Sequence, residues 1–293
     1  MRGITVAALA LAVGLSGAAA QAQEASTKNI QLAWFQRHNI FHSGLVGSHT
    51  IALTFDDGPN TRTRAVLAAL RKVKIKATFF IVGRMAKAHP GILREIAAEG
   101  HLLANHSATH PLLSSRYDRH PERLIRQIRI VNDEIAPLQP RHTRLFFRAP
   151  YGAWRSAHAA ILNADPVLKH YIGPIYWDAG GETRMNAHGY VMSSADWNCW
   201  SRHWSAQICA KGYLREIRRH NGGVVLMHCI HSQSGDLVAA VLPPLIQEGY
   251  RFVRLDQVPS YDKYKTPTGP QAPVVAVAAA GGGPSAHRAA AAP

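Results

Sequence analysis

The sequence alternates short apolar runs with amphipathic stretches over most of its length, and this alternation constrains its fold more than any other feature. Strands are predicted at His49–Phe55, Ala77–Val82, His101–Ala104, Leu145–Phe147, Val224–Met227 and Tyr250–Val253. Helices are predicted at Arg62–Lys72, Gly91–Glu99, Glu122–Ile135, Ala206–Arg219 and Leu237–Gln247. Repeated alternation of this kind predicts an α/β fold with parallel strands covered by helices. With about seven repeats a barrel is favoured over an open sheet, and functional side chains are expected at the carboxyl ends of its strands.

The amino-terminal end has the composition of a secretory signal. Residues 1–22 contain Arg2, an apolar run Ile4–Leu15, and small residues that suit cleavage after Ala20 or Ala22. The apolar run is shorter than the roughly 20 residues that span a bilayer, so it predicts a signal peptide, with an uncleaved membrane anchor as the alternative. We therefore expect an exported protein, periplasmic or secreted, that is not an integral membrane protein.

Composition divides the rest of the chain into three parts. Residues 23–44 are a lead-in, and residues 45–260 carry the strand and helix pattern and form the predicted folded domain. Residues 261–293 are rich in Pro, Ala and Gly without periodicity, which predicts a flexible tail.

The chain is strongly basic, with 33 Lys and Arg against 18 Asp and Glu and a formal net charge of +15. A positive field attracts polyanions such as nucleic acid, anionic lipid or acidic cell-envelope polymers. Nucleic acid is not the expected partner, because the basic residues are scattered and lack the interleaved aromatic residues of a single-strand binding groove. Export favours envelope polymers, and a merely solvated basic surface is the alternative.

The three cysteines all lie beyond the predicted signal. A disulfide between Cys199 and Cys209 would close a short loop in an oxidising compartment, which would leave Cys229 unpaired and partly buried. The sequence has no Cys-x-x-Cys pattern, so a zinc ribbon is not supported.

Two adjacent carboxylates follow the first predicted strand. Asp56 and Asp57 are succeeded by Gly58-Pro59, which enforces a turn. Neighbouring like charges raise one pKa unless a cation lies beside them. Two carboxylates with different neighbours can divide the work, one binding a metal and the other acting as a base. The alternative is an ordinary turn with a helix cap.

Two histidines follow the third predicted strand, in Asn105-His106-Ser107-Ala108-Thr109-His110. Residues four apart share one side of a helical turn, so we expect the rings of His106 and His110 to converge on one ion. Imidazole nitrogen with carboxylate oxygen suits zinc or another first-row metal, and two histidines with one carboxylate leave positions open for water and substrate. Alone, this pair would be weak support for a metal site in a chain with 17 histidines.

Three further polar clusters come after predicted strands. Arg148 begins Arg-Ala-Pro-Tyr-Gly, and its guanidinium could hold a carboxylate ionised and oriented. Asp196-Trp197 and Leu226-Met227-His228 could supply a buried Asp that raises the proton affinity of an imidazole and makes it a general acid. Each cluster alone would be interpreted as part of a turn or of the core, without a role in function.

Taken together, TFDDGP, His-Ser-x-x-His, Arg-x-Pro-Tyr-Gly, Asp-Trp and Leu-Met-His resemble the NodB-type polysaccharide deacetylases, carbohydrate esterase family four. The resemblance covers residues 48–257. It implies a distorted (β/α) barrel with about seven strands, in agreement with the alternation. It also implies hydrolysis of acetyl groups with one divalent metal, Zn²⁺ first, with Co²⁺ or another first-row metal as alternatives.

The resemblance implies a role for each residue of the first two clusters. Asp57, His106 and His110 would ligate the metal, and Ser107 would steady their loop by hydrogen bonding. Asp56 would be the general base that activates the attacking water.

The other clusters would complete the site. Arg148 would orient the base, and the backbone N–H of Tyr151 would stabilise the oxyanion. His228 would protonate the leaving amine, tuned by Asp196. Two residues would line the acetyl pocket: Trp197 and Leu226.

The sequence departs from the family pattern at several places. The interval from Arg148 to Asp196 is long and contains Asp178–Glu182, which predicts an insertion along one wall of the substrate groove. Tyr176-Trp177-Asp178 resembles the tryptophan that precedes the fourth motif and makes Asp196-Trp197 the least secure pairing.

Near the fifth motif, Cys229 stands where an acidic residue often follows the histidine. His231 lies close enough to compete with His228 as the general acid.

The expected substrate is an acetylated amino-sugar polysaccharide, peptidoglycan first and chitin-like chains next. An esterase that removes O-acetyl groups from xylan is the alternative enzyme, since the same metal site serves esters and amides. The non-enzymatic alternatives are a polysaccharide-binding protein with a decayed site and an envelope protein that binds polyanions. The oligomeric state is not predicted.

Overall fold

The computed structural model describes residues 46–140, 143 and 145–264. The predicted signal peptide, the lead-in 23–44 and residues 265–293 of the predicted tail lie outside these residues. Within the described part of the chain, the helices are all too short or too polar to cross a bilayer.

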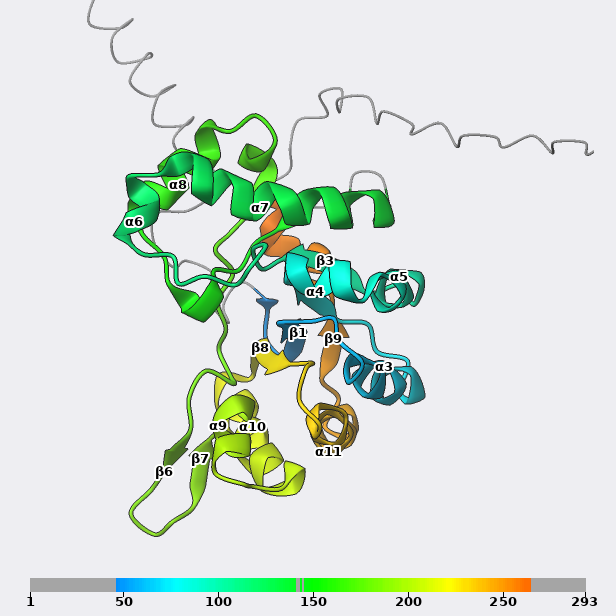
Figure 1. The fold of residues 1–293 in the computed structure, drawn as a ribbon. Helices are drawn as coiled ribbons and strands as arrows, with labels where there is room; N and C mark the ends of the chain where they lie inside the picture. The colour runs from blue at the N-terminus through cyan, green and yellow to red at the C-terminus, as the bar shows by residue number, and fades with distance from the viewer. Residues whose placement is uncertain (1–45, 141–142, 144, 265–293) are drawn as a thin grey trace, which may run out of the picture.

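A parallel sheet forms the centre of the fold (Figure 1). Its central strand β1 pairs with β8 on one side, and on the other side with β2 at its carboxyl end and β9 at its amino end. Strand β3 lies outside β2. The bounds of these strands are β1 Thr50–Asp56, β2 Thr78–Ile81, β3 Leu102–Asn105, β8 Gly222–His228 and β9 Arg251–Val253.

A second parallel pair closes the sheet into an irregular barrel. Strands β4 (Leu145–Phe146) and β5 (Tyr171–Ile172) pair with each other, and a bridge between Asn105 and Phe147 joins them to β3. A further bridge, between Ala179 and Val225, joins the segment after β5 to β8. The predicted distorted (β/α) barrel is confirmed, with parallel pairing throughout the ring and only short ladders where β4 and β5 complete it.

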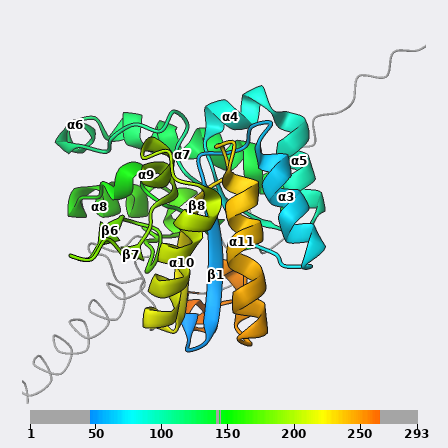
Figure 2. The ribbon, with the colours of Figure 1, turned by 90° about the horizontal axis from the view of Figure 1, so that it is seen from below.

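Helices cover the outside of the ring (Figure 1, Figure 2). In Figure 2, α10 and α11 flank β1 on either side. The α-helices are α3 Thr63–Lys72, α4 Gly83–Ala88, α5 Pro90–Ala98, α6 Ser115–Asp118, α7 Pro121–Ile135, α8 Ser156–Ala164, α9 Asp196–Ser201, α10 Ala206–His220 and α11 Ser234–Gln247. Short 3-10 helices lie at Ala136–Leu138, Pro150–Gly152, Leu168–His170, Leu255–Gln257 and Pro259–Tyr264.

The predicted strands and helices agree with these bounds to within a few residues. Every residue of β1 is buried, as a strand covered on both faces requires. Helix α7 buries Leu124, Ile128, Val131 and Ile135, the stripe expected from its sequence. The 3-10 helix Pro259–Tyr264 extends past residue 260, where the tail was predicted to begin. Tyr261 is fully buried and its ring lies 5.7 Å from that of Phe146, so this residue packs with the folded domain.

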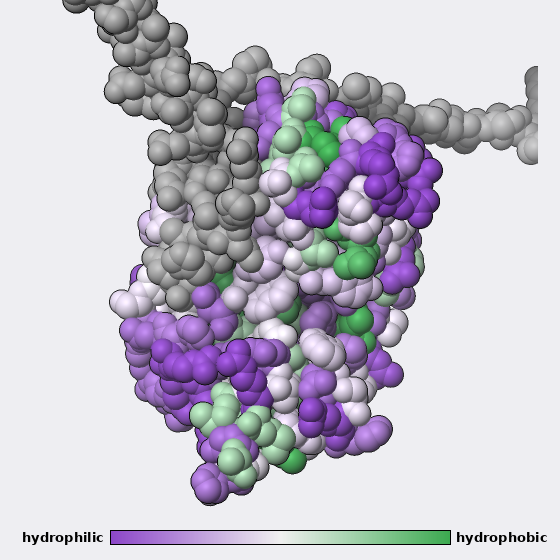
Figure 3. All heavy atoms as spheres, turned by 90° about the vertical axis from the view of Figure 1, so that its left-hand side faces the viewer, coloured by the Kyte–Doolittle hydropathy of each residue, from purple (hydrophilic) through white to green (hydrophobic). Residues whose placement is uncertain are grey.

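Ala179, in the segment Asp178–Glu182 that was predicted as an insertion, forms a bridge with Val225 of β8 and so belongs to the ring. Farther along the interval between Arg148 and Asp196, an antiparallel hairpin packs against α10. It comprises β6 (Arg184–Met185) and β7 (Val191–Ser193) and leads directly into α9. Apolar side chains gather over it at the lower end of the face in Figure 3, where Met185 and Met192 are exposed.

The predicted disulfide between Cys199 and Cys209 is present and ties α9 to α10. Cys229 is free and buried, as expected.

Candidate metal centre and active site

The polar clusters predicted from the sequence meet at one end of the barrel. Asp56 ends β1, His106 follows β3, Arg148 follows β4 and His228 ends β8. Because the carboxyl ends of parallel strands lie at the same edge of a barrel, residues far apart in the chain become neighbours there.

Three of these side chains form a compact set of ligands. The ligand atoms of Asp57, His106 and His110 all lie within 4.8 Å of one another. Asp57 Oδ1 lies 3.1 Å from His110 Nε2 and 3.5 Å from His106 Nε2. This oxygen is buried and, among the described residues, accepts no hydrogen bond. A buried anionic oxygen facing two imidazole nitrogens fits a divalent cation such as zinc.

The two histidines converge through a loop and not through the helical turn expected from their spacing. Residues 106–110 are not helical, and both Ser107 and His110 have left-handed backbone conformations, with φ of 67° and 57°. The Ser107 hydroxyl accepts the His110 N–H at 3.1 Å, and Asn105 Oδ1 accepts the Ser107 N–H at 3.0 Å. Ser107 thus steadies the loop as expected. Residues other than glycine adopt left-handed backbone conformations at an energetic cost, and such residues concentrate at functional sites.

The surroundings favour the ligating protonation states. His106 Nδ1 lies 2.8 Å from the Arg148 carbonyl oxygen, so it carries the proton there and leaves Nε2 free toward Asp57. Burial lowers the pKa of His106, which keeps its imidazole neutral. Burial acts to raise the pKa of Asp57, but the close approach of His110 and the electrostatic influence of His106 and His228 hold it well below its usual range.

Asp56 makes a different contact, with a buried arginine. Arg148 Nη1 donates to Asp56 Oδ1 at 2.7 Å and to Thr54 Oγ1 at 2.9 Å, and Arg148 Nε donates to the Ile175 carbonyl. The guanidinium lies 4.1 Å from the ring centre of Phe80 and 5.5 Å from that of Trp177. These contacts fix the plane of the guanidinium, and the predicted contact between Arg148 and Asp56 is present.

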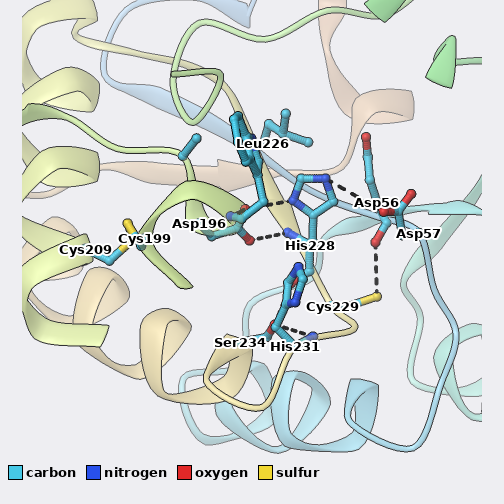
Figure 4. A network of polar contacts seen from close by, with 12 residues as sticks. Asp56, Asp57, Asp196, Cys199, Cys209, Leu226, His228, Cys229, His231 and Ser234 are labelled. Atoms are coloured by element: carbon cyan, nitrogen blue, oxygen red, sulfur yellow. Dashed lines mark hydrogen bonds and ion pairs between the residues drawn. A yellow bond between two sulfur atoms is a disulfide. The ribbon is translucent and has the colours of Figure 1, made fainter. Parts of the chain in front are cut away.

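His228 lies between Asp196 and the adjacent pair Asp56 and Asp57 (Figure 4). Its Nδ1 is 2.7 Å from Asp196 Oδ1, and its backbone N–H donates to Asp196 Oδ2 at 2.6 Å. Its Nε2 lies 4.0 Å from Asp57 Oδ2 and thus faces the ligand set. Burial would lower the pKa of His228, but the charge of Asp196 and its hydrogen bond raise it to about 9. The structure therefore brings together the pairing that was least secure in the sequence.

His231 is less well placed for the acid role. Its ring centre is 6.1 Å from that of His228, and burial lowers its pKa. Its backbone N–H donates to the Ser234 hydroxyl, away from the carboxylate pair (Figure 4).

Of the residues predicted to contact substrate, Tyr151 lies against the ligand set, Trp197 begins the helix that carries Asp196, and Leu226 lies in the strand that carries His228. Tyr151 has a left-handed conformation with φ of 58°, is 68% exposed, and its ring centre lies 4.6 Å from that of His110. Trp197 is 50% exposed at the start of α9. Leu226 is buried in β8, two positions before His228.

The supporting contacts of two residues, Phe80 and Cys229, were not predicted. Phe80 stacks on Arg148 but is one of several apolar residues in a strand run, so its sequence carries no functional signal. Cys229 donates to the Asp56 carbonyl oxygen from both its N–H and its Sγ, and the thiol fills the space beside Gly58, where a Cβ would meet Sγ at 2.4 Å. A larger residue at either position would displace the carboxylate turn.

Comparison with known proteins identifies the family. The sequence profile of the polysaccharide deacetylases matches residues 44–167. A peptidoglycan-N-acetylglucosamine deacetylase of Bacillus cereus is 36% identical over 229 residues, which cover 76% of this chain and 73% of that protein. The chain belongs to the polysaccharide deacetylase family.

Other members share part or all of this fold. A chitooligosaccharide deacetylase of Sinorhizobium fredii is 42% identical over 138 residues, 46% of this chain and 63% of that protein. The matched part therefore spans slightly less than two thirds of this relative. The structure of the peptidoglycan deacetylase PdaC from Bacillus subtilis superposes with a TM-score of 0.54 at 27% identity, covering 74% of this polysaccharide deacetylase and 93% of PdaC. The family and fold predicted from the sequence are confirmed.

Proposed function

We propose that this polysaccharide deacetylase is a metal-dependent hydrolase that removes N-acetyl groups from N-acetylglucosamine-containing polysaccharide and releases acetate. The observation that carries the proposal is the meeting of two separate carboxylate systems at one edge of the barrel: Asp57 with two histidines, and Asp56 with Arg148. The products are acetate and a glucosamine unit with a free amine.

Asp57, His106 and His110 would hold the metal, for which we propose Zn²⁺. When bound, a zinc ion would supply Lewis acidity toward the acetyl carbonyl and the attacking water. The remaining roles belong to residues of the chain.

Asp56 takes the proton from the attacking water as its oxygen adds to the acetyl carbon. The guanidinium of Arg148 occupies one carboxylate oxygen, Oδ1, and so fixes the direction in which the base acts. The Tyr151 N–H, at the turn that presents its ring to His110, donates to the oxyanion that forms on the carbonyl oxygen.

His228 gives a proton to the amide nitrogen as the carbon–nitrogen bond breaks. An amine leaves as a neutral group only if it is protonated, so this step needs an acid that stays charged at neutral pH. Asp196 keeps the imidazole of His228 charged, because its Oδ1 lies 2.7 Å from His228 Nδ1.

The substrate class is supported by the relatives and by the surface. The Bacillus cereus and Sinorhizobium fredii relatives are named for peptidoglycan N-acetylglucosamine and for chitooligosaccharide. Tyr151 is an exposed aromatic side chain beside His110, and Trp197 is an exposed aromatic side chain next to Asp196, as sugar rings need for stacking. The predicted signal peptide at residues 1–22 supports export. The net charge of +15 supports attraction to an acidic envelope polymer, with peptidoglycan as the first substrate.

The experiment that tests this proposal measures acetate release from N-acetylglucosamine oligomers, peptidoglycan and acetylated xylan, with zinc and after chelation. Release from the amino-sugar substrates that is lost with chelator and restored by zinc is expected. Release from acetylated xylan alone would instead identify an O-acetyl esterase. Saturable binding of the oligomers without acetate release would indicate a non-catalytic polysaccharide-binding protein, although each predicted ligand, base and acid is present.

A further inference from the structure

The Asp196 that holds the general acid is reached through the inserted hairpin, so its position needs an explanation that the barrel strands do not supply. We propose that Tyr213, on α10, is a positioning residue for the Asp196–His228 pair and acts through its hydroxyl group. This inference rests on the proposed function, since it concerns the step in which His228 protonates the leaving amine.

The contacts of Tyr213 place its hydroxyl between the two elements that carry the pair. The Asp196 backbone N–H donates to the Tyr213 hydroxyl oxygen at 3.2 Å, and that hydroxyl donates to the Leu226 carbonyl at 3.0 Å. The Tyr213 side chain is fully buried. A single hydroxyl therefore joins the first residue of α9 to strand β8, using both its acceptor and its donor capacity.

These bonds close a ring of hydrogen bonds around the general acid. Leu226 precedes His228 by two residues on β8, and Asp196 accepts hydrogen bonds from both the backbone and the ring of His228. The carboxylate is thus fixed relative to the imidazole at its side-chain end by His228 and at its backbone end by Tyr213. Tyr213 thus adds a second link between α9 and β8, beside the one through His228.

The hairpin of β6 and β7 packs against α10, the helix that carries Tyr213. Strands β6 and β7 form a separate two-stranded sheet, and β7 returns along α10. A Cβ at Gly212 would meet Ser194 Oγ at 2.0 Å, so only glycine permits this close approach of the returning segment to α10. The disulfide from Cys199 to Cys209 fastens the far part of α9 to the same helix.

A purely structural role for Tyr213 is the competing interpretation, because buried tyrosines usually satisfy their hydroxyl groups. The two interpretations differ in which reactions they affect. Loss of a structural hydroxyl would weaken hydrolysis of all substrates alike. Loss of a positioning hydroxyl would slow only reactions whose leaving group must be protonated, since a phenolate leaves without a proton while an amine does not.

The test compares Tyr213→Phe with the wild type on two substrates in the zinc-loaded protein: an N-acetylglucosamine oligomer and 4-nitrophenyl acetate. We expect kcat on the oligomer to fall about five- to tenfold, the cost of one lost hydrogen bond in the transition state, with KM unchanged. We expect hydrolysis of 4-nitrophenyl acetate to change by less than about twofold. Asp196→Ala should show the same selectivity with a larger loss.

Tyr250→Phe is the matched control, because it removes one hydroxyl from a buried tyrosine beside β9, at the amino end of the barrel. It should alter neither substrate's kcat, and thermal melting of each variant would show that the fold is retained. An equal fall on both substrates, or no fall on the oligomer, would overturn the inference. Failure of the proposed function is distinct, because the wild type itself would then release no acetate from the oligomer.

Discussion

Arg148 Nη1 and Asp56 Oδ1 lie 2.7 Å apart in the interior of the barrel, although 92 positions separate the residues in the sequence. This contact assigns different tasks to two adjacent carboxylates. Asp56 is held by a guanidinium that itself lies against Phe80, whereas Asp57 turns toward two imidazoles. The division expected from the Asp-Asp pair is therefore a consequence of two neighbouring strand ends, β3 and β4, each presenting a different partner.

Replacing Arg148 with lysine should cost about 100-fold in kcat/KM on N-acetylglucosamine oligomers, since a small misplacement of a catalytic group has effects of that size. Lysine keeps the charge but cannot bond Asp56, Thr54 and the Ile175 carbonyl together in one plane. Steady-state kinetics on the zinc-loaded variant would measure this loss. Activity within threefold of the wild type would show that orientation by the guanidinium is unimportant.

Asp196→Asn should move the alkaline limb of the kcat–pH profile to lower pH. The protonated imidazole of His228 is the acid, so kcat of the wild type is expected to fall as pH rises through the His228 pKa of about 9. Burial lowers this pKa and the charge of Asp196 raises it, so removing that charge leaves burial opposed only by the charges of Asp57 and Asp56. Profiles of both proteins at saturating zinc and substrate would test this; an unmoved limb would contradict it.

The two histidines that compete for the acid role can be separated by substitution. His228→Gln should lower kcat on the oligomer by about 10²- to 10⁴-fold, the usual contribution of a general acid. His231→Gln should lower it by less than about threefold, because a side chain that does not reach the leaving group transfers no proton. The reverse order of effects would assign the acid to His231.

Much of the fold and most of the site could be predicted because four of the predicted strands end at or beside a polar cluster. The convergence of His106 and His110 was predicted correctly, but its cause was not, since left-handed conformations at Ser107 and His110 leave no trace in residue spacing. The long interval from Arg148 to Asp196 predicted an insertion at Asp178–Glu182, but the hairpin Arg184–Ser193 was not predicted, because its strands are too short and exposed to show periodicity. Tyr213 occupies a core position of an amphipathic helix, where its sequence looks like ordinary packing.

The disulfide should stabilise the fold measurably. Cross-linking Cys199 to Cys209, ten positions apart, restricts the unfolded chain. Replacing both with alanine should reduce the free energy of unfolding by about 2–3 kcal/mol, the amount expected for so short a loop. Urea unfolding would measure this, with reduced wild-type protein as the control. If reductant left the wild-type midpoint unchanged, the two thiols would not be cross-linked.

The proposed hydrolysis depends most on Asp57, His106 and His110 sharing one divalent cation. The most direct measurement is calorimetric titration of Zn²⁺ into chelator-stripped wild type and Asp57→Asn, with acetate release followed in the same samples. We expect one tight site in the wild type, activity that returns in proportion to its occupancy, and loss of both in the variant. Full hydrolysis by the stripped protein, or by Asp57→Asn, would contradict the proposed metal centre.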